Sequence, residues 1–260
     1  MSQWFKTLDD RFWLRSDEEG AEEARFIKRA LHLRKGQAVL DAPCGAGRIG
    51  FHFARAGCAV TGVDLRPRFV ARARGRFRRT RLSGTFRVMD LRDLDFEGRF
   101  HGVFNWFGSF GYFSEAENLD VLRRYARALR KGGRLLIDQP NREYILRHFV
   151  AERWDGDLCM RNHWERRTQR IVSRRILRGR DDPKNLSSVR LYTLGQVRHL
   201  FRRAGLVMEN VYGSFNGDEF RRSSRRMITA GRKPKTGSGQ TGSVFDRQVS
   251  GRVRCRRIRA

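Results

Sequence analysis

The sequence predicts a doubly wound α/β fold, in which helices cover both faces of a mostly parallel sheet. Two observations support this prediction: short apolar segments alternate with helical segments over residues 21–140, and a glycine-rich turn follows the first apolar segment. Such alternation implies parallel strands joined by right-handed crossovers. Ligands of these sheets bind at the carboxyl ends of the strands, so functional residues are expected at that edge.

Seven strands are expected in the sheet. Five alternate with helices and two follow later, at residues 37–41, 58–65, 86–94, 100–107, 134–140, 206–213 and 225–233. Apolar residues at helical spacing predict a helical prelude at residues 21–33 and the intervening helices at residues 48–57, 68–81, 117–133 and 193–205. The Gly132-Gly133 pair is expected to stop the helix at 117–133.

Three segments lie outside this alternation. Residues 153–190 read as one or two antiparallel strands and a polar turn, and are predicted to form a small antiparallel lid inserted after the fifth strand. Residues 1–35 are predicted to form a helical lid, whose Trp4, Phe12 and Trp13 are candidates to fold over a bound ligand. Residues 235–260 are expected to be a disordered basic tail.

The composition is typical of one folded domain. Hydrophobic residues make up 39% of the chain, which is enough for a core. No apolar stretch reaches the length of a membrane span, and the first residues lack the apolar segment of a signal peptide, so a cytoplasmic protein without membrane contact is expected. The four cysteines are scattered and expected to be free thiols, and no metal-ligand spacing appears, so no metal is expected.

The net charge of +28 is the one unusual property. Arginine supplies 49 of the 56 basic residues, and such one-sided usage is typical of a codon bias rather than of a designed binding face. A basic surface still attracts nucleic acid whatever its origin. A noncatalytic nucleic-acid-binding protein therefore remains an alternative.

The strongest motif is DAPCGAGR at residues 41–48, directly after the first strand. Gly45 and Gly47 allow a sharp turn and a close approach to a ligand, and the next helix directs free amide groups at it. The spacing also matches the dinucleotide fingerprint, a pattern of low specificity. However, Asp41 at the strand tip would repel a pyrophosphate and attract the cationic amino group of S-adenosylmethionine, so the sequence favours this methyl donor.

Two further carboxylates end the second and third strands. Asp64 can accept both hydroxyls of a ribose, which suits either cofactor. Asp90 can accept an exocyclic amine, and Leu91 offers apolar contact to an adenine. Any one aspartate could simply cap a helix, but three at successive strand tips favour an adenosine that carries a positive arm.

A resemblance to a known family rests on several segments together. The strings VLDAPCGAGR, VTGVDL, MDLRDLDFEGRF, NWFGSFGYF and RALRKGGRLLIDQPNREY resemble bacterial class I S-adenosylmethionine-dependent methyltransferases of the Methyltransf_25 and Methyltransf_11 type, closest to a subgroup with an SFGYF segment. The resemblance covers residues 1–234. It implies a Rossmann-like methyltransferase domain at residues 36–234, S-adenosylmethionine as cofactor, and a substrate pocket over the carboxyl end of the sheet.

Position and resemblance together nominate the site residues. Those expected to hold the cofactor are Asp41, Gly45, Gly47, Asp64, Leu65, Asp90, Leu91 and Asn105. Those expected to face the substrate are Phe110, Tyr112, Asn141, Arg142, Arg190 and Tyr192. Methyl transfer is an in-line displacement at an already activated carbon, so positioning is the main task and no catalytic dyad is required. Tyr112 and Tyr192 are the candidates for a proton acceptor.

The expected function is methyl transfer from S-adenosylmethionine to a small-molecule acceptor. An RNA or protein acceptor is the alternative, suggested by the arginine-rich helical segment at 66–81 and by the basic tail. The fourth strand ends in NWFG, without the NPPY-type tetrapeptide of many base-amino methyltransferases, which argues against RNA.

Overall fold

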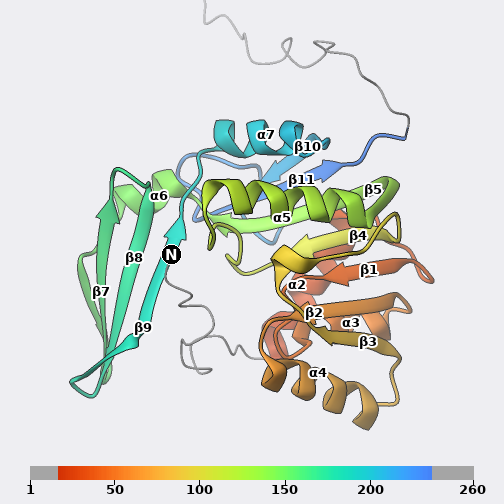
Figure 1. The fold of residues 1–260 in the computed structure, drawn as a ribbon, viewed down its shortest axis with the longest axis horizontal. Helices are drawn as coiled ribbons and strands as arrows, with labels where there is room; N and C mark the ends of the chain where they lie inside the picture. Colours follow the sequence, from red (N-terminus) through yellow and green to blue (C-terminus); the bar gives the residue numbers. More distant parts are fainter. Residues whose placement is uncertain (1–16, 236–260) are drawn as a thin grey trace, which may run out of the picture.

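The computed structural model describes residues 17–235, and its centre is a seven-stranded sheet (Figure 1). The order across the sheet is β10-β11-β5-β4-β1-β2-β3. The strands are β1 (Ala38–Asp41), β2 (Ala59–Asp64), β3 (Gly84–Val88), β4 (Phe100–Asn105), β5 (Leu129–Pro140), β10 (Val207–Tyr212) and β11 (Arg226–Arg232). Only β11 runs against its neighbours, β5 and β10. The predicted mostly parallel, Rossmann-like sheet is confirmed.

Helices cover both faces of this sheet (Figure 1). They are α2 (Asp17–Ala30), α3 (Arg48–Arg55), α4 (Pro67–Arg79), α5 (Glu115–Ala128), α6 (Arg142–Arg147) and α7 (Leu194–Arg203). One buried core contains Leu122 of α5 and Phe201 of α7. The core on the other face contains Ile27 of α2, Phe53 of α3 and Val70 of α4. The sheet is thus buried on both sides, as parallel sheets require.

Local sequence explains where the helices begin. Ser114 and Glu117 form a capping box at the start of α5, and Thr193 and Gln196 form another at the start of α7. Each cap satisfies backbone amides that have no partner within the helix and contributes about 1 kcal/mol. Pro67 begins α4, where its fixed φ suits the first helical position.

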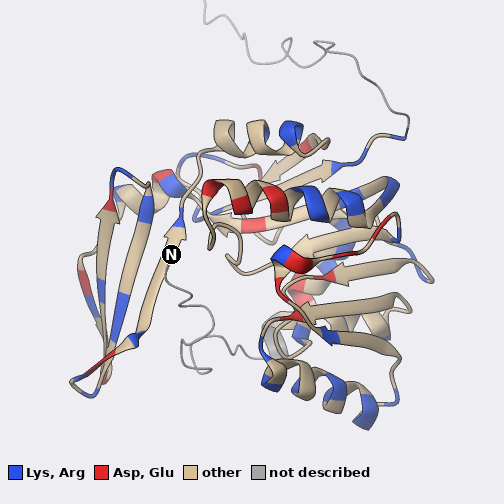
Figure 2. Cartoon of the chain, in the orientation of Figure 1, with Lys and Arg blue, Asp and Glu red and all other residues tan. Residues whose placement is uncertain are grey.

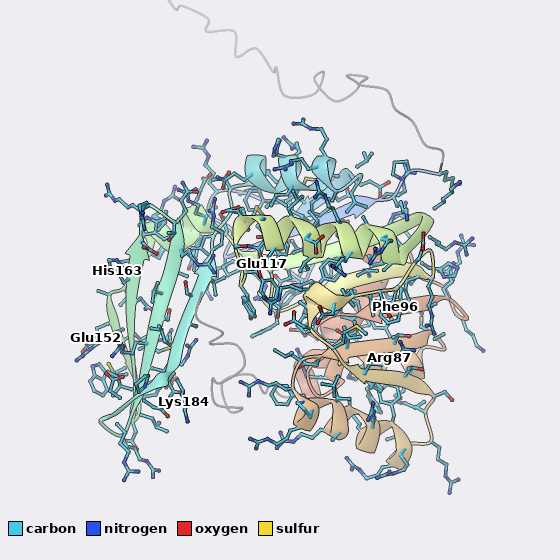
Figure 3. All side chains as sticks on the ribbon, viewed as in Figure 1. Arg87, Phe96, Glu117, Glu152, His163 and Lys184 are labelled. Atoms are coloured by element: carbon cyan, nitrogen blue, oxygen red, sulfur yellow. The ribbon has the colours of Figure 1, made fainter. Side chains whose placement is uncertain are left out.

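Residues 152–190 form a second, separate sheet, the lid sheet. Its antiparallel strands are β6 (Glu152–Asp155), β7 (Leu158–Glu165), β8 (Arg170–Leu177) and β9 (Arg180–Arg190). The antiparallel arrangement is confirmed, but one or two strands were too few, and most of the expected polar turn at 178–186 belongs to β9. Glu152, His163 and Lys184 are exposed polar residues of these strands (Figure 3). The strands lack the alternation of apolar and polar residues that identifies a half-buried strand from sequence.

Two predicted boundaries also differ from the structure. The third strand ends at Val88, and the residues after it form a turn that includes the short 3-10 helix η2 (Leu91–Asp93). Helix α5 ends at Ala128, so the Gly132-Gly133 pair lies inside β5 and does not stop the helix. At Gly133 an added Cβ would come within 2.9 Å of the Phe100 carbonyl oxygen, so the pair permits close strand packing instead.

Some predictions fall outside the described residues. These are the proposed lid residues Trp4, Phe12 and Trp13, and the tail from residue 236 onward. Within residues 17–235, no helix is long and apolar enough to cross a membrane. Within the same range no group of side chains could hold a metal, and Cys44, Cys58 and Cys159 are free thiols. The cytoplasmic location and the domain boundaries remain predictions.

Basic residues occur on most helices and strands (Figure 2). In the lid sheet, Arg161 pairs with Glu152 and Arg174 pairs with Asp181. On α4, by contrast, arginines extend along the helix and no acidic residue lies on it. The unusual charge of the chain is therefore locally balanced in some elements and concentrated in others.

Candidate functional site

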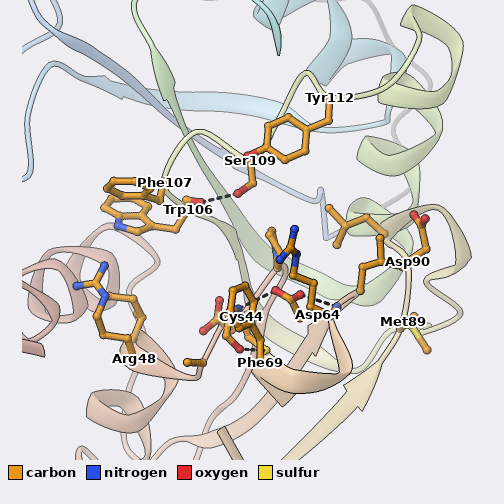
Figure 4. Close-up of a pocket in the computed structure, with 18 of the residues that line it drawn as sticks. Cys44, Arg48, Asp64, Phe69, Met89, Asp90, Trp106, Phe107, Ser109 and Tyr112 are labelled. Atoms are coloured by element: carbon orange, nitrogen blue, oxygen red, sulfur yellow. Dashed lines mark hydrogen bonds between the residues drawn. The ribbon is translucent and has the colours of Figure 1, made fainter. Parts of the chain in front are cut away.

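A pocket lies at the carboxyl ends of β1 and β2, bordered by η2 and by the segment that follows β4 (Figure 4). Several predicted site residues line it together, namely Asp41, Gly45, Asp64, Leu65, Asp90, Leu91 and Tyr112. The sheet topology brings them together because the parallel strands end at one edge. No residue of the described lid sheet lines this pocket.

The turn between β1 and α3 forms the floor of the pocket. Gly45 has a φ of 52°, and the space where a Cβ would stand is open. Gly47 has a φ of 75°, but its missing Cβ leaves room for Ala73 of α4, which would otherwise lie 2.9 Å away. Gly47 does not line the pocket, so its role is to let α3 and α4 pack closely.

Backbone amides hold the carboxylate of Asp64 in place. The N–H of Gly45 donates to Oδ2 at 2.9 Å, and the N–H of Arg66 donates to Oδ1 at 2.9 Å. Burial raises the pKa of Asp64, and these two hydrogen bonds oppose the rise. The carboxylate is therefore oriented from behind, with its remaining lone pairs available to a ligand.

Asp41 is buried more completely and has fewer partners. Burial raises its pKa well above the ordinary value, and the nearby charge of Asp64 raises it further, while Arg48 and the amide of Gly50 oppose the rise. Within the described part of the chain, Oδ2 of Asp41 accepts no hydrogen bond. A buried carboxylate in this condition is stabilised by any cation that enters the pocket.

Asp90 and Leu91 lie just beyond the end of β3, where Asp90 caps η2 and Leu91 begins it. Asp90 caps η2 by accepting from the Arg92 amide at 3.0 Å, and its carboxylate pairs with the Arg92 guanidinium at 2.8 Å. Arg92 also pairs with Glu117 of α5 at 2.8 Å. Asp90 thus lines the pocket, and its ion pair with Arg92, which also binds Glu117, holds η2 in position against α5.

Aromatic residues form the wall opposite the glycine turn. Trp106, Phe107, Tyr112 and Phe113 line the pocket after β4. Phe107 has a φ of 63°, unusual for a bulky residue, and its amide donates to Asp138 Oδ2 at 2.9 Å.

Asp138 lies at the end of β5 and also pairs with Arg226 of β11. Burial raises the pKa of Asp138, and the charge of Arg226 opposes the rise. The pair fixes the start of the aromatic segment.

Tyr112, one proton-acceptor candidate, is not equipped to accept a proton near neutral pH. Burial raises the pKa of its phenol. The hydroxyl therefore remains protonated and acts as a hydrogen-bond donor. The same holds for Tyr192, whose pKa is raised by burial and by Glu115, and whose hydroxyl donates to Glu115 at 3.1 Å.

Two other predicted residues lie behind the pocket and not on its lining. Asn105 is fully buried, and its side-chain amide donates to the Ala42 carbonyl at 3.1 Å and to the Tyr125 hydroxyl at 2.9 Å. Phe110 is buried in the core, where its ring lies 5.6 Å from that of Tyr192. Both residues support the strand tip from beneath.

The polar residues predicted at the pocket mouth instead have structural partners away from the lining. Asn141 caps α6 and donates to backbone carbonyls of residues 221, 222 and 224. Arg142 donates to Gln169 and lies over the ring of Trp164. Arg190 is buried and pairs with Glu115. The expectation that these residues face the pocket is corrected.

Several lining residues were missed from the sequence. They include Arg48, Arg66, Phe69, Met89 and Ser109. Arg48 follows the glycine turn, and it pairs with Glu23 of α2 at 2.6 Å. Its place as the last residue of the motif was the one available signal, and the abundance of arginine in the chain masked it.

Comparisons with known proteins agree with this geometry. Residues 39–133 match a family model described as "Methyltransferase domain". The ubiquinone biosynthesis O-methyltransferase of Xanthomonas oryzae pv. oryzae is 29% identical over 154 residues, which cover 53% of this chain and 59% of the relative. The cypemycin N-terminal methyltransferase of a Streptomyces species is 29% identical over 205 residues, which cover 74% and 82%. The chain thus spans well under two thirds of the first relative's length.

Solved structures share the fold. The CcbJ methyltransferase of Streptomyces caelestis superposes with a TM-score of 0.71 at 18% identity, covering 85% of this chain and 93% of that one. CalS10 of Micromonospora echinaspora, described as an amino pentose methyltransferase with bound SAM, gives a TM-score of 0.62 at 21% identity, covering 86% and 94%. At this level of identity the likeness shows the fold.

Proposed function

We propose that the protein transfers a methyl group from S-adenosylmethionine to a small-molecule acceptor, and the match of residues 39–133 to a methyltransferase family model supports this. One observation carries this proposal: the carboxylates of Asp41, Asp64 and Asp90 line a single pocket at the carboxyl edge of the sheet. Acidic residues grouped in this way disfavour a pyrophosphate and favour a cationic ligand.

The residues present fit S-adenosylmethionine. Asp41, whose Oδ2 has no partner among the described residues, would hold the ammonium group of the amino acid end. Asp64, oriented by two amides, would accept the ribose hydroxyls. Asp90, Leu91 and Met89 would border the adenine.

When bound, this donor supplies a methyl group on a positively charged sulfur. The chain's own part is to position and to exclude water. Trp106 and Phe107 would shield the reacting atoms from water, and their ring faces attract a positive charge. Tyr112 keeps its proton and would orient an acceptor by donating a hydrogen bond.

A small-molecule acceptor fits the apolar, aromatic wall of the pocket. A relative from Streptomyces venezuelae, 26% identical over 229 residues covering 80% of this chain and 92% of the relative, is named as an N,N-dimethyltransferase of a dTDP-linked amino sugar. The ubiquinone relatives are named for O-methylation. These names support a small-molecule acceptor.

Isothermal calorimetry tests the proposal. The purified protein should bind S-adenosylmethionine and S-adenosylhomocysteine, and should not bind NAD⁺. Asp64→Asn should weaken both adenosyl ligands by about tenfold or more, since one charged acceptor is worth roughly 1.5–3 kcal/mol. Asp95→Asn, which removes an exposed carboxylate outside the pocket, is the matched control and should change nothing. NAD⁺ binding, or no adenosyl binding by folded protein, would contradict the proposal.

A further inference from the structure

One strongly charged surface is not used by the pocket. Residues 65–89 contain nine arginines and no Asp or Glu. Seven of these arginines are exposed and do not line the pocket, and four that lie on α4 form what we call the arginine face: Arg72, Arg74, Arg78 and Arg79. None of the four takes part in an ion pair among residues 17–235.

The helix geometry places these charges together. Phe69, Val70, Ala73 and Phe77 are buried, so they define the core side of α4. Arg72 and Arg79 are seven residues apart, which is about two turns, and therefore share the solvent side.

Arg74 and Arg78, four residues apart, share the side of α4 that faces β3. The guanidinium of Arg74 donates to the Phe86 carbonyl of β3 at 2.6 Å. A carbonyl does not neutralise the charge. Arg87 of β3 does not belong to this surface, because its guanidinium lies over Phe96, in the core on the other face of the sheet from α4.

The abundance of arginine in the chain does not by itself explain this surface. On α5, Arg124 pairs with Asp120 at 2.7 Å. At the other edge of the sheet, Arg134 and Arg232 share Glu209 at 2.9 and 2.6 Å. In Figure 2 the ribbon of α4 is coloured for basic residues at several positions and for no acidic residue. Helix α7 also carries arginines and no acidic residue, but it has three arginines where α4 has six, and of the two helices only α4 lies beside the pocket.

We propose that the arginine face docks the phosphodiester backbone of a nucleic acid. Guanidinium groups pair with phosphates, and contacts of this kind give affinity without reading the base sequence. A membrane surface is a poorer match, because α4 exposes no large apolar side chain that could enter lipid. Phe69 and Arg76 of the same helix line the pocket, so the docked strand would lie beside its rim.

The test compares two variants of equal charge in the full chain. The first carries Arg72→Gln, Arg78→Gln and Arg79→Gln on α4. The second carries Arg198→Gln, Arg202→Gln and Arg203→Gln on α7, three exposed arginines of a helix at the opposite edge of the sheet. Fluorescence anisotropy with labelled single-stranded RNA and duplex DNA is measured across a salt series. Binding of S-adenosylhomocysteine, or a thermal melt if that ligand does not bind, checks folding.

The α4 variant should bind nucleic acid roughly tenfold more weakly or worse, and the slope of log affinity against log salt should fall by about two, since each phosphate contact contributes about 0.7 to 0.9. The α7 variant should bind like the parent protein. Equal losses in both variants would overturn the proposal, because they would mean that only net charge matters. So would binding to phosphatidylglycerol vesicles that depends on α4 when neither nucleic acid binds.

Discussion

Two buried charged groups differ in how many hydrogen-bond partners the chain gives them: Arg170, at the junction where the lid sheet meets the segment before α5, and Asp41 at the pocket. At the junction, the Arg170 guanidinium donates to the carbonyls of Gly111, Tyr112, Phe113 and Ser188 at 2.8 to 3.0 Å. Nε donates to the Ser188 hydroxyl, so each of the three guanidinium nitrogens has at least one acceptor.

At the pocket, Asp41 is as deeply buried, yet Oδ2 has no partner among the described residues. A buried charged group with a structural role finds its hydrogen-bond partners within the chain. One that binds a ligand keeps at least one polar atom without a partner until the ligand is bound.

The largest effect is expected at Arg170. Arg170→Met should cost about 3 to 5 kcal/mol of folding free energy, because it leaves several buried carbonyls without donors. Urea unfolding measures the loss, and Arg167→Met, at an exposed position of the same turn, is the control. A loss below about 1 kcal/mol would show that the junction is less tightly ordered than its contacts indicate.

The two glycines of the motif have different roles: Gly47 allows close packing of the helices, and Gly45 lines the pocket. Gly47→Ala should cost about 1 to 3 kcal/mol, because the new methyl group meets Ala73 and the backbone has a positive φ. Gly45→Ala should cost about 1 kcal/mol from φ alone, since its Cβ would enter open space, but should weaken binding of S-adenosylhomocysteine. Thermal melts and calorimetry on both variants test this, and the reverse order of stability losses would contradict it.

The smallest effect on stability is expected at Asp41. Its pKa is raised in the folded state, so the folded protein holds its proton to higher pH than the unfolded chain does. Stability therefore falls as pH rises from the unfolded pKa, about 4, toward the folded one. Asp41→Asn should remove this fall and make the protein slightly more stable than the parent at neutral pH. Urea unfolding from pH 4 to 7 would contradict this interpretation if both proteins showed the same pH dependence.

Sequence alone located the strand tips well. Asp41, Asp64 and Asp90 each end an apolar segment, and parallel strands must finish at one edge. The direction of individual side chains was harder to predict. Asn105 and Phe110 are next in sequence to residues that line the pocket, yet the side chains of both are buried in the core.

Arg48 and Met89 could not be selected from sequence, because their place on the lining depends on how α3 and η2 are set against the sheet. The lid sheet was underestimated for a related reason. Its strands carry polar residues on both faces, so no period of two marks them. Its anchors, Arg170 and Arg190, are buried by contacts with residues distant in the chain.

The measurement that tests this account most directly is proton release on binding, obtained by calorimetry in two weakly acidic buffers of different ionisation enthalpy. If the positively charged methyl donor pairs with the carboxylate of Asp41, its binding lowers the pKa of that carboxyl. S-adenosylmethionine should then displace protons from the parent protein, and Asp41→Asn should abolish the release. Tight binding with no proton release, or with the same release in the variant, would contradict the account.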